Sequence, residues 1–384
     1  MPRLPISEWR KLPVSLSELC IDTTLRCGQS FRWRRINDEW NCVLHGRLLS
    51  LKQDEHFLHY KVTWPAKTKP KDDDDTEALL RHYFSLKYDL KALYDQWSGS
   101  DLNFRKKASK FTGIRILSQD AWEALIGFIC SSNNNISRIS SMVEKLCIHY
   151  GPLIAKVGGE AYHDFPTAKE LTGRKVEAHL RELGFGYRAK YIANTALIVS
   201  TVKPEGWLDG LANPENPGWA TNPKLGENSE PPTYRSAHEK ILELPGVGPK
   251  VADCVCLMGL GWGESVPVDT HVWQIAQRDY KFGGKSQTKT LSKGMYDSVG
   301  DHFRKIWGPQ AGWAQSVLFT ANLKSFSEQA AGKVESTVVI KAEVMEEVDT
   351  KSKKRRITAI EVVKTENGGL LDSGGSRKRR KTRS

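Results

Sequence analysis

Two residues, Lys250 and Asp269, have the types and the spacing for covalent chemistry on a sugar. A lysine pressed into a partly apolar site loses some preference for its charged form, so its amine can act as a nucleophile. A nearby carboxylate can then stabilise the cationic charge that develops on the sugar. A simpler interpretation is also open, in which Lys250 lies on the surface and Asp269 only caps a helix.

The segment before and around Lys250 predicts a helical hairpin. Residues 239–244 have the apolar spacing of a short helix, and the run PGVG at 245–248 breaks it. Pro249 suits the first position of a second helix, which we expect to run from Lys250 to about Leu260. The bare N–H groups at such a turn bind an anion, and phosphate is the obvious candidate for a basic protein.

The sequences LPGVGPKVAD and VPVDTH around Lys250 and Asp269 resemble the signature of the helix-hairpin-helix DNA glycosylases. Among these, the chain is most similar to the eukaryotic 8-oxoguanine DNA glycosylase/AP lyase family, over roughly residues 10–328. The resemblance implies that Lys250 attacks C1′ of a flipped nucleotide, that a Schiff base forms and that β-elimination nicks the strand. Pro249 and Thr270 depart from the family's motifs at positions without an assigned role.

The resemblance also implies a DNA interface, because a flipped base requires a phosphate anchor and a wedge that fills the gap. The residues implied for the anchor are Gly246, Gly248, Val251 and His271. The stretch SSNNNISR is similar to the family's insertion segment, and the residues implied for the wedge and the orphaned cytosine are Asn133, Arg138, Tyr187 and Arg188. Without the resemblance, the asparagine run would be a plain turn and the histidine a structural residue.

The implied base pocket draws on distant segments. CGQSFRW at 27–33 resembles the family's N-terminal pocket segment, where the Gly28 carbonyl would accept a hydrogen bond from N7–H. 8-Oxoguanine has this proton and guanine lacks it, and a site built on one buried hydrogen bond rejects the analogue that cannot form it. The other implied pocket residues are Gln315 at the Watson–Crick edge, Phe319 and Cys254 at the two faces and Met258 at the wall. Taken alone, a phenylalanine four residues after a glutamine is more often a core residue beside a surface one.

Two rival functions share the hairpin. A glycosylase for alkylated bases or oxidised pyrimidines would use it, but the implied pocket is shaped for a purine. A non-catalytic DNA-binding or scaffold protein would need only the hairpin amides, which leaves Lys250 and Asp269 unexplained. We therefore expect a glycosylase/lyase that excises 8-oxoguanine, and formamidopyrimidine-type purines, opposite cytosine. No metal or cofactor is implied, and because no cysteine follows Cys256, we do not expect the iron–sulfur cluster of some relatives.

The composition is typical of a globular intracellular protein with a basic tail. The chain has 384 residues, 39% of them hydrophobic, and seven cysteines without a paired pattern, as expected for reduced thiols. No apolar run reaches the roughly 18 residues of a membrane span. The net charge is +12, of which residues 351–384 hold +9. Basic clusters at 351–356 and 377–381 favour import into the nucleus, with a solvated tail as the alternative and a mitochondrial pool left open.

The expected fold class is α+β. Alternation at 30–35, 40–44 and 58–64 predicts an antiparallel sheet of three strands, which the resemblance makes TATA-binding-protein-like. Helical spacing is found at 77–84, 89–97, 121–130, 136–150, 168–184, 189–202 and 312–325. We divide the chain into a β-rich domain (1–110), a helical glycosylase domain (111–329) with a flexible insertion at about 205–233, and a disordered basic tail (330–384). We expect a monomer that binds double-stranded DNA.

Overall fold

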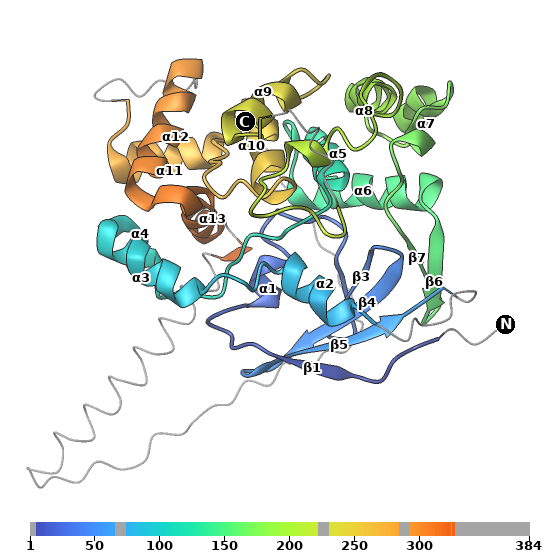
Figure 1. The fold of residues 1–384 in the computed structure, drawn as a ribbon, viewed down its shortest axis with the longest axis horizontal. Helices are drawn as coiled ribbons and strands as arrows, with labels where there is room; N and C mark the ends of the chain where they lie inside the picture. The colour runs from blue at the N-terminus through green and yellow to red at the C-terminus, as the bar shows by residue number, and fades with distance from the viewer. Residues whose placement is uncertain (1–4, 66–73, 222–229, 284–291, 324, 327–384) are drawn as a thin grey trace, which may run out of the picture. The chain divides into compact units, whose positions relative to one another are not determined.

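The N-terminal part of the chain builds a five-stranded antiparallel sheet. In the computed structural model, which describes residues 5–65, 74–221, 230–283, 292–323 and 325–326, the strand order is β1-β5-β4-β3-β2. The strands are β1 (Arg10–Pro13), β2 (Arg34–Ile36), β3 (Glu39–Leu44), β4 (Arg47–Gln53) and β5 (Phe57–Thr63). A two-stranded hairpin of β6 (Leu153–Val157) and β7 (Glu160–His163) packs beside it through Ala155 and Tyr162. Figure 1 shows the sheet below a larger body of helices.

One face of the sheet is covered by α2 (Thr76–Tyr83). Trp40, Cys42 and Leu44 lie on that face, as their alternation predicts, and Trp40 and Cys42 pair with Leu51 and Leu49 of β4. Leu79, Leu80 and Tyr83 of α2 are buried against these residues. An apolar strand face and an apolar helix stripe thus bury each other, which is the usual way for a small sheet to form a core.

The expected number of three strands is wrong, because β1 and β4 are also present. The apolar residues of β4, in RLLSLKQ, are not strictly alternating, because four consecutive residues are buried on both sides of the sheet. The expected strand at 30–35 is also too long. It begins at Arg34, since Phe31 turns into the helical core while Trp33 packs in the core of the sheet.

The rest of the described chain is mainly helical. Its helices are α1 (Ile21–Thr24), α3 (Leu90–Ser100), α4 (Leu102–Ala108), α5 (Ala121–Ser131), α6 (Ile136–Tyr150), α7 (Val176–Glu182), α8 (Arg188–Leu197), α9 (Tyr234–Leu242), α10 (Pro249–Met258), α11 (Thr270–Tyr280), α12 (Lys293–Trp307) and α13 (Ala311–Asn322). A π-helical turn (Ile198–Val202) extends α8, and single 3-10 turns lie at Lys169–Leu171, Asp209–Leu211 and Gly308–Gln310. The expected helix at 168–184 is therefore too long, since only one turn and α7 are helical.

Helices α5 and α10 lie side by side at the centre of the helical body. Nine of the 11 residues of α5 are buried, so this helix is apolar all round. The two helices approach closely after α10 ends, where a side chain on Gly259 would come within 3.0 Å of the Ala121 backbone. The Gln119 amide also donates to the Met258 carbonyl at 2.8 Å. The C-terminal end of α5 and the N-terminal end of α10 thereby point to the same side of the molecule.

The described part of the predicted insertion, residues 205–221, packs against both halves of the body. Leu208, Leu211 and Ala212 are buried in the helical core. Farther along, Asn216 accepts a hydrogen bond from the Tyr88 hydroxyl at 2.8 Å. This stretch therefore contributes to the shared core, which its Gly, Pro and Asn content does not indicate. Residues 222–229 and the predicted tail lie outside the described residues.

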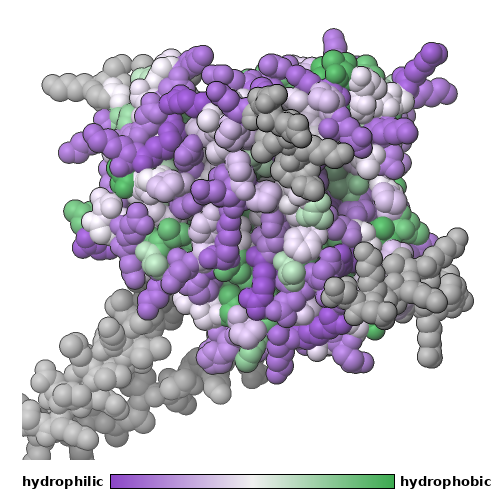
Figure 2. Space-filling model, in the orientation of Figure 1, coloured by the Kyte–Doolittle hydropathy of each residue, from purple (hydrophilic) through white to green (hydrophobic). Residues whose placement is uncertain are grey.

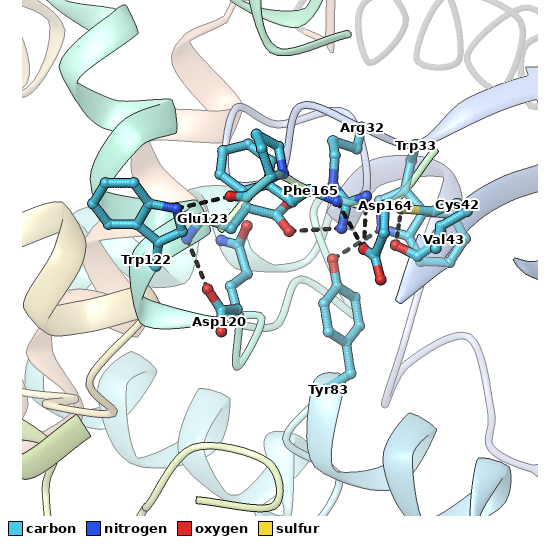
Figure 3. Close-up of polar contacts among 12 residues, drawn as sticks. Arg32, Trp33, Cys42, Val43, Tyr83, Asp120, Trp122, Glu123, Asp164 and Phe165 are labelled. Atoms are coloured by element: carbon cyan, nitrogen blue, oxygen red, sulfur yellow. Dashed lines mark hydrogen bonds and ion pairs between the residues drawn. The ribbon is translucent and has the colours of Figure 1, made fainter. Parts of the chain in front are cut away.

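A buried ion cluster joins the sheet region to the helices (Figure 3). The Arg32 guanidinium donates to both carboxylate oxygens of Glu123 on α5, at 2.9 and 2.7 Å, and lies 3.5 Å from Asp164. Asp164 in turn accepts from the Gly46 amide at 2.8 Å. Such bidentate pairing fixes orientation as well as distance. The predicted boundary at residue 110 therefore separates two parts that share charged contacts, and it stays a prediction.

The face drawn in Figure 2 is mostly hydrophilic, with small, scattered hydrophobic patches. No helix in the described ranges is long and apolar enough to cross a bilayer. The seven cysteines are all free thiols, and six of them are buried, as expected.

Candidate active site

A cleft of about 980 Å³ opens where α5, α6, α10 and α11 meet. Its walls include the turn 131–135, the start of α10 and residues 268–271. A second, small cavity of about 40 Å³ adjoins it. The residues that line both cavities are Gly28, Phe128, Lys250, Asp269 and Phe319. The structure therefore brings together side chains from five separate parts of the sequence, including the two predicted to carry the chemistry.

The predicted helical hairpin is present and forms one rim of the cleft. Helix α9 begins at a capping box, in which Thr233 and Ser236 bond each other's backbone amides. Gly246 has φ +79°, a left-handed conformation that glycine adopts at little cost. Gly248 then caps α10, and Pro249 occupies its first turn. The first amides of α10 have no acceptor within the helix, so they face outward as donors for an anion.

We expect Gly246→Ala to destabilise the fold by about 2–4 kcal/mol. The new side chain would need a left-handed backbone and would come within 2.6 Å of the Tyr191 ring. Gly248→Ala is the matched control, because Gly248 has a negative φ and open space around it. It should cost about 1 kcal/mol or less. Urea unfolding of the three proteins tests this, and equal losses for both variants would contradict it.

Lys250 is half-buried at the N-terminal end of α10, facing α5. Its Nζ donates to Ser131 Oγ at 3.2 Å and lies 5.0 Å from the centre of the Phe128 ring. Cys254 follows one helical turn later and is fully buried, which raises the pKa of its thiol to about 11, against the opposing effect of the Lys250 charge. The thiol is therefore neutral at physiological pH. Lys250 also lines the cleft, so its amine can be reached from there.

Asp269 caps α11 and lines the same cleft. Its Oδ1 accepts hydrogen bonds from the amides of His271 and Val272, both at 2.9 Å. These bonds hold the carboxylate in place at the start of the helix. Within the described chain no direct hydrogen bond joins Asp269 to Lys250. Both line the passage between the cleft and the small cavity.

The small cavity contains all five predicted base-pocket residues, Gly28, Cys254, Met258, Gln315 and Phe319. Gly28 has φ +87° and lies beside Ile136, where a side chain would find its nearest neighbour at 3.1 Å. Gln315 is buried on α13. The ring of Phe319 lies edge-on to His271, with centroids 5.8 Å apart. At about 40 Å³ the cavity has room for a few water molecules and not for a purine, so lining side chains must move before a base can enter.

The asparagine turn between α5 and α6 is braced from α8. Arg188 is buried, and its Nη2 donates to the carbonyl oxygens of Ser132 and of Asn133, the latter at 3.2 Å. The Tyr187 hydroxyl donates to the same Ser132 carbonyl at 3.1 Å. Asn133 itself is exposed at the rim of the cleft with φ +48°. Arg138 is exposed in the first turn of α6, whose cap is Asn135.

Two family models match the chain. Residues 11–125 match the family model described as 8-oxoguanine DNA glycosylase, N-terminal domain. Residues 126–296 match the HhH-GPD superfamily base excision DNA repair protein. The Saccharomyces cerevisiae N-glycosylase/DNA lyase is 40% identical over 338 residues, which are 82% of this chain and 86% of the yeast protein. This chain belongs to the N-glycosylase/DNA lyase family.

Other relatives extend the similarity to plants and to solved structures. The Arabidopsis thaliana N-glycosylase/DNA lyase OGG1 is 35% identical, over 82% of this chain and 80% of its own. The structure of MBOgg1 in complex with a low-affinity DNA ligand is 26% identical with a TM-score of 0.64, covering 83% of this chain and 98% of that one. The fold is shared too with the Clostridium acetobutylicum 8-oxoguanine glycosylase/lyase, at 23% identity and a TM-score of 0.65, over 83% and 96% of the two chains. The predicted α+β fold class is thereby confirmed.

Sequence reasoning missed several residues of this N-glycosylase/DNA lyase site. Phe128 lies under the Lys250 amine, and Ser131 accepts its hydrogen bond. Both belong to the apolar helix and polar turn that the sequence did mark, but nothing in the pattern shows which side chains face Lys250. Asp253 is easier to find from the sequence, because it is a carboxylate within a run of buried residues of α10. A charge in such a position requires partners.

Proposed function

We propose that Lys250 and Asp269 carry out the family's two reactions, base excision and strand cleavage, on 8-oxoguanine paired with cytosine. As a member of this family the protein is a bifunctional DNA glycosylase/AP lyase of base excision repair. The observation that carries the assignment is the convergence of the Lys250 amine and the Asp269 carboxylate at the mouth of the small cavity. A reactive sugar carbon held there would face both groups at once.

In the proposed mechanism the damaged nucleotide is flipped out of the duplex so that its base enters the small cavity. The Lys250 amine attacks C1′, and the bond between C1′ and the base breaks. Asp269 stabilises the positive charge that develops on the sugar, because it is a fixed carboxylate close to the reacting carbon. The base leaves with a proton, and the C1′–O4′ bond of the sugar ring then breaks, which gives a Schiff base between C1′ and Lys250. Loss of a C2′ proton and departure of the 3′ phosphate by β-elimination nick the strand. None of these steps requires a metal or an organic cofactor.

The proposed choice of base rests on Gly28, Gln315 and the two residues that would flank the base. The carbonyl of Gly28 would accept the N7–H of 8-oxoguanine, and Gln315 would bond the Watson–Crick edge. Phe319 and Cys254 would contact the two faces, which suits a neutral thiol. A glycosylase for small alkylated bases has no use for a carbonyl acceptor at this position, since it would be left unpaired. The same argument extends to formamidopyrimidine-type purines.

Contacts to the opposite strand are proposed for Asn133, Arg138, Tyr187 and Arg188. Asn133, Arg138 and Tyr187 are exposed at or near the rim, where a duplex would reach them. Arg188 differs, because its guanidinium is buried and bonded to the turn carbonyls. Its Nε has no partner in the described structure. Arg188 therefore reads the orphaned cytosine only if the turn moves on binding, and otherwise it supports Asn133.

The proposal is tested by single-turnover nicking of matched duplexes. With excess enzyme, a duplex with 8-oxoguanine opposite cytosine should react faster than one with guanine by a factor on the order of 10⁴. The 8-oxoguanine–adenine duplex measures the contribution of the opposite base, and a duplex with an alkylated purine tests the rival. Equal rates for 8-oxoguanine and guanine, or a faster reaction of the alkylated base, would refute the assigned pocket.

Monomeric state, nuclear location and the open question of a mitochondrial pool stay predictions. The basic clusters that suggest nuclear import lie outside the described residues.

A further inference from the structure

A buried carboxylate, Asp253, lies on α10 three residues after Lys250 and lines neither of the two cavities. Asp253 is 1% exposed, and burial raises its pKa against the opposing effects of His238 and of its hydrogen bonds. The hydroxyl of Tyr234 on α9 donates to Oδ1 at 2.5 Å, and Ser265 Oγ donates to the same oxygen at 2.8 Å. The hydroxyl of Tyr296 on α12 donates to Oδ2. Three elements therefore converge on one side chain.

Two of these partners connect Asp253 to the segment that presents Asp269. The Tyr296 hydroxyl, besides donating to Asp253, accepts a hydrogen bond from the Val268 amide at 3.3 Å. Val268 is the residue immediately before Asp269. Ser265, in the same segment, also donates to the Asp253 carbonyl oxygen at 2.9 Å. A continuous path of hydrogen bonds thus runs from the helix of Lys250 to the backbone at Asp269.

This path connects the elements that carry the two proposed catalytic groups. Lys250 lies on α10 and Asp269 caps α11, and no hydrogen bond joins their side chains within the described residues. Their separation depends on how the connection 259–268 is held against α10. Because reaction rates fall steeply when a reacting group is displaced by even 1 Å, such a connection has to be fixed precisely.

We propose that Asp253 and Tyr296 are positioning residues that hold Asp269 at a fixed position relative to Lys250. The inference rests on the proposed roles of Lys250 and Asp269. An apolar side chain would fill the Asp253 position without the desolvation of a carboxylate. The carboxylate instead bonds hydroxyl groups from three elements, and hydrogen bonds are directional where apolar contacts are not. The network therefore sets the orientation of the segment and not merely its packing.

The chain offers a matched control for Tyr296. Tyr234 donates a hydroxyl to the same carboxylate and is equally buried, at 9% exposed. It lies on α9 and, among the described residues, forms no hydrogen bond to the segment 265–269. Tyr234→Phe and Tyr296→Phe each remove one hydroxyl from the Asp253 network and leave the ring in place. Only the second also removes the acceptor of the Val268 amide.

The experiment measures three quantities for wild type and both variants of the full chain. These are the melting temperature, the Kd for a duplex with an abasic-site analogue, and the single-turnover rate of base excision at saturating enzyme. We expect Tyr296→Phe to slow excision about 10- to 100-fold relative to Tyr234→Phe. The two variants should show similar losses in melting temperature and a Kd within about twofold of wild type.

Asp253 is tested by two further variants. Asp253→Asn keeps an oxygen acceptor in the same place and should retain more of the excision rate than Asp253→Leu, which fills the space without one. If Tyr296→Phe and Tyr234→Phe excise equally fast, the network is structural only and the inference is overturned. An inactive wild type on 8-oxoguanine would instead overturn the proposed function. The excision rate of Asp253→Leu is compared only if that protein folds. The comparison of Tyr296→Phe with Tyr234→Phe tests the inference without it.

Discussion

Replacement of Lys250 by glutamine is expected to abolish the covalent adduct that borohydride traps on an 8-oxoguanine duplex. Glutamine is similar in length and can still bond Ser131 Oγ, the contact that Nζ makes at 3.2 Å. It lacks a nucleophilic amine, so neither the Schiff base nor β-elimination can follow. The nicking rate should fall by at least about 10⁴-fold, as for other catalytic nucleophiles. Gel separation of trapped and free DNA gives both results in one assay.

Lys293 provides the control for this experiment. It lines the same cleft at the start of α12, so Lys293→Gln removes a second cationic amine from the same surface. That variant should still form the adduct, with at most a modest loss of DNA affinity. An adduct that persists in Lys250→Gln and disappears in Lys293→Gln would show that the nucleophile is assigned to the wrong lysine. A third outcome is that wild type and both variants bind the lesion tightly and none of them forms an adduct. That result would contradict the proposed lyase reaction.

Asp269→Asn should reduce base excision about 10²- to 10³-fold with little change in stability. Asparagine caps helices as well as aspartate does, and it retains an oxygen for the amides of His271 and Val272. The substitution therefore removes the negative charge and preserves the start of α11. Because the charge is proposed to stabilise a cationic sugar, the loss should fall on the single-turnover rate and not on the Kd for DNA. Single-turnover nicking and fluorescence titration separate the two.

A second variant distinguishes charge from capping. Asp269→Ala loses the caps as well, which should lower stability by about 1 kcal/mol beyond the catalytic loss. If Asp269→Asn excises at the wild-type rate while Asp269→Ala is slow, Asp269 matters as a helix cap alone, which is the simpler interpretation of this residue.

The sequence alone predicts the parts of this protein that have local causes. The helix Ile136–Tyr150 is predicted with both ends correct, because Asn135 caps it and its apolar spacing is unbroken. The hairpin is equally clear, since Pro249 and two glycines determine its turn. Lys250 and Asp269 follow from the hairpin and a capping position. Each of these features depends on a few neighbouring residues.

The remaining features depend on contacts between distant segments. Nothing in the local pattern brings Gly28 and Gln315, 287 residues apart in number, to one cavity, and only the family resemblance placed them there. The burial of Arg188 follows from the fold of the asparagine turn above it. Strand β4 was not predicted, because burial on both faces removes the alternation that marks a strand. Tertiary packing decided these cases.

The small volume of the base cavity has a consequence for how the enzyme searches DNA. A glycosylase that slides along a chromosome meets undamaged guanines almost exclusively. Because the cavity holds only about 40 Å³, an extruded guanine finds no ready compartment and must first displace side chains that line it, such as Phe319. A base that gains no compensating hydrogen bond inside returns to the duplex before Lys250 can reach its sugar. Opening the cavity is therefore required for normal and damaged bases alike, and the hydrogen bonds inside it are what distinguish the two.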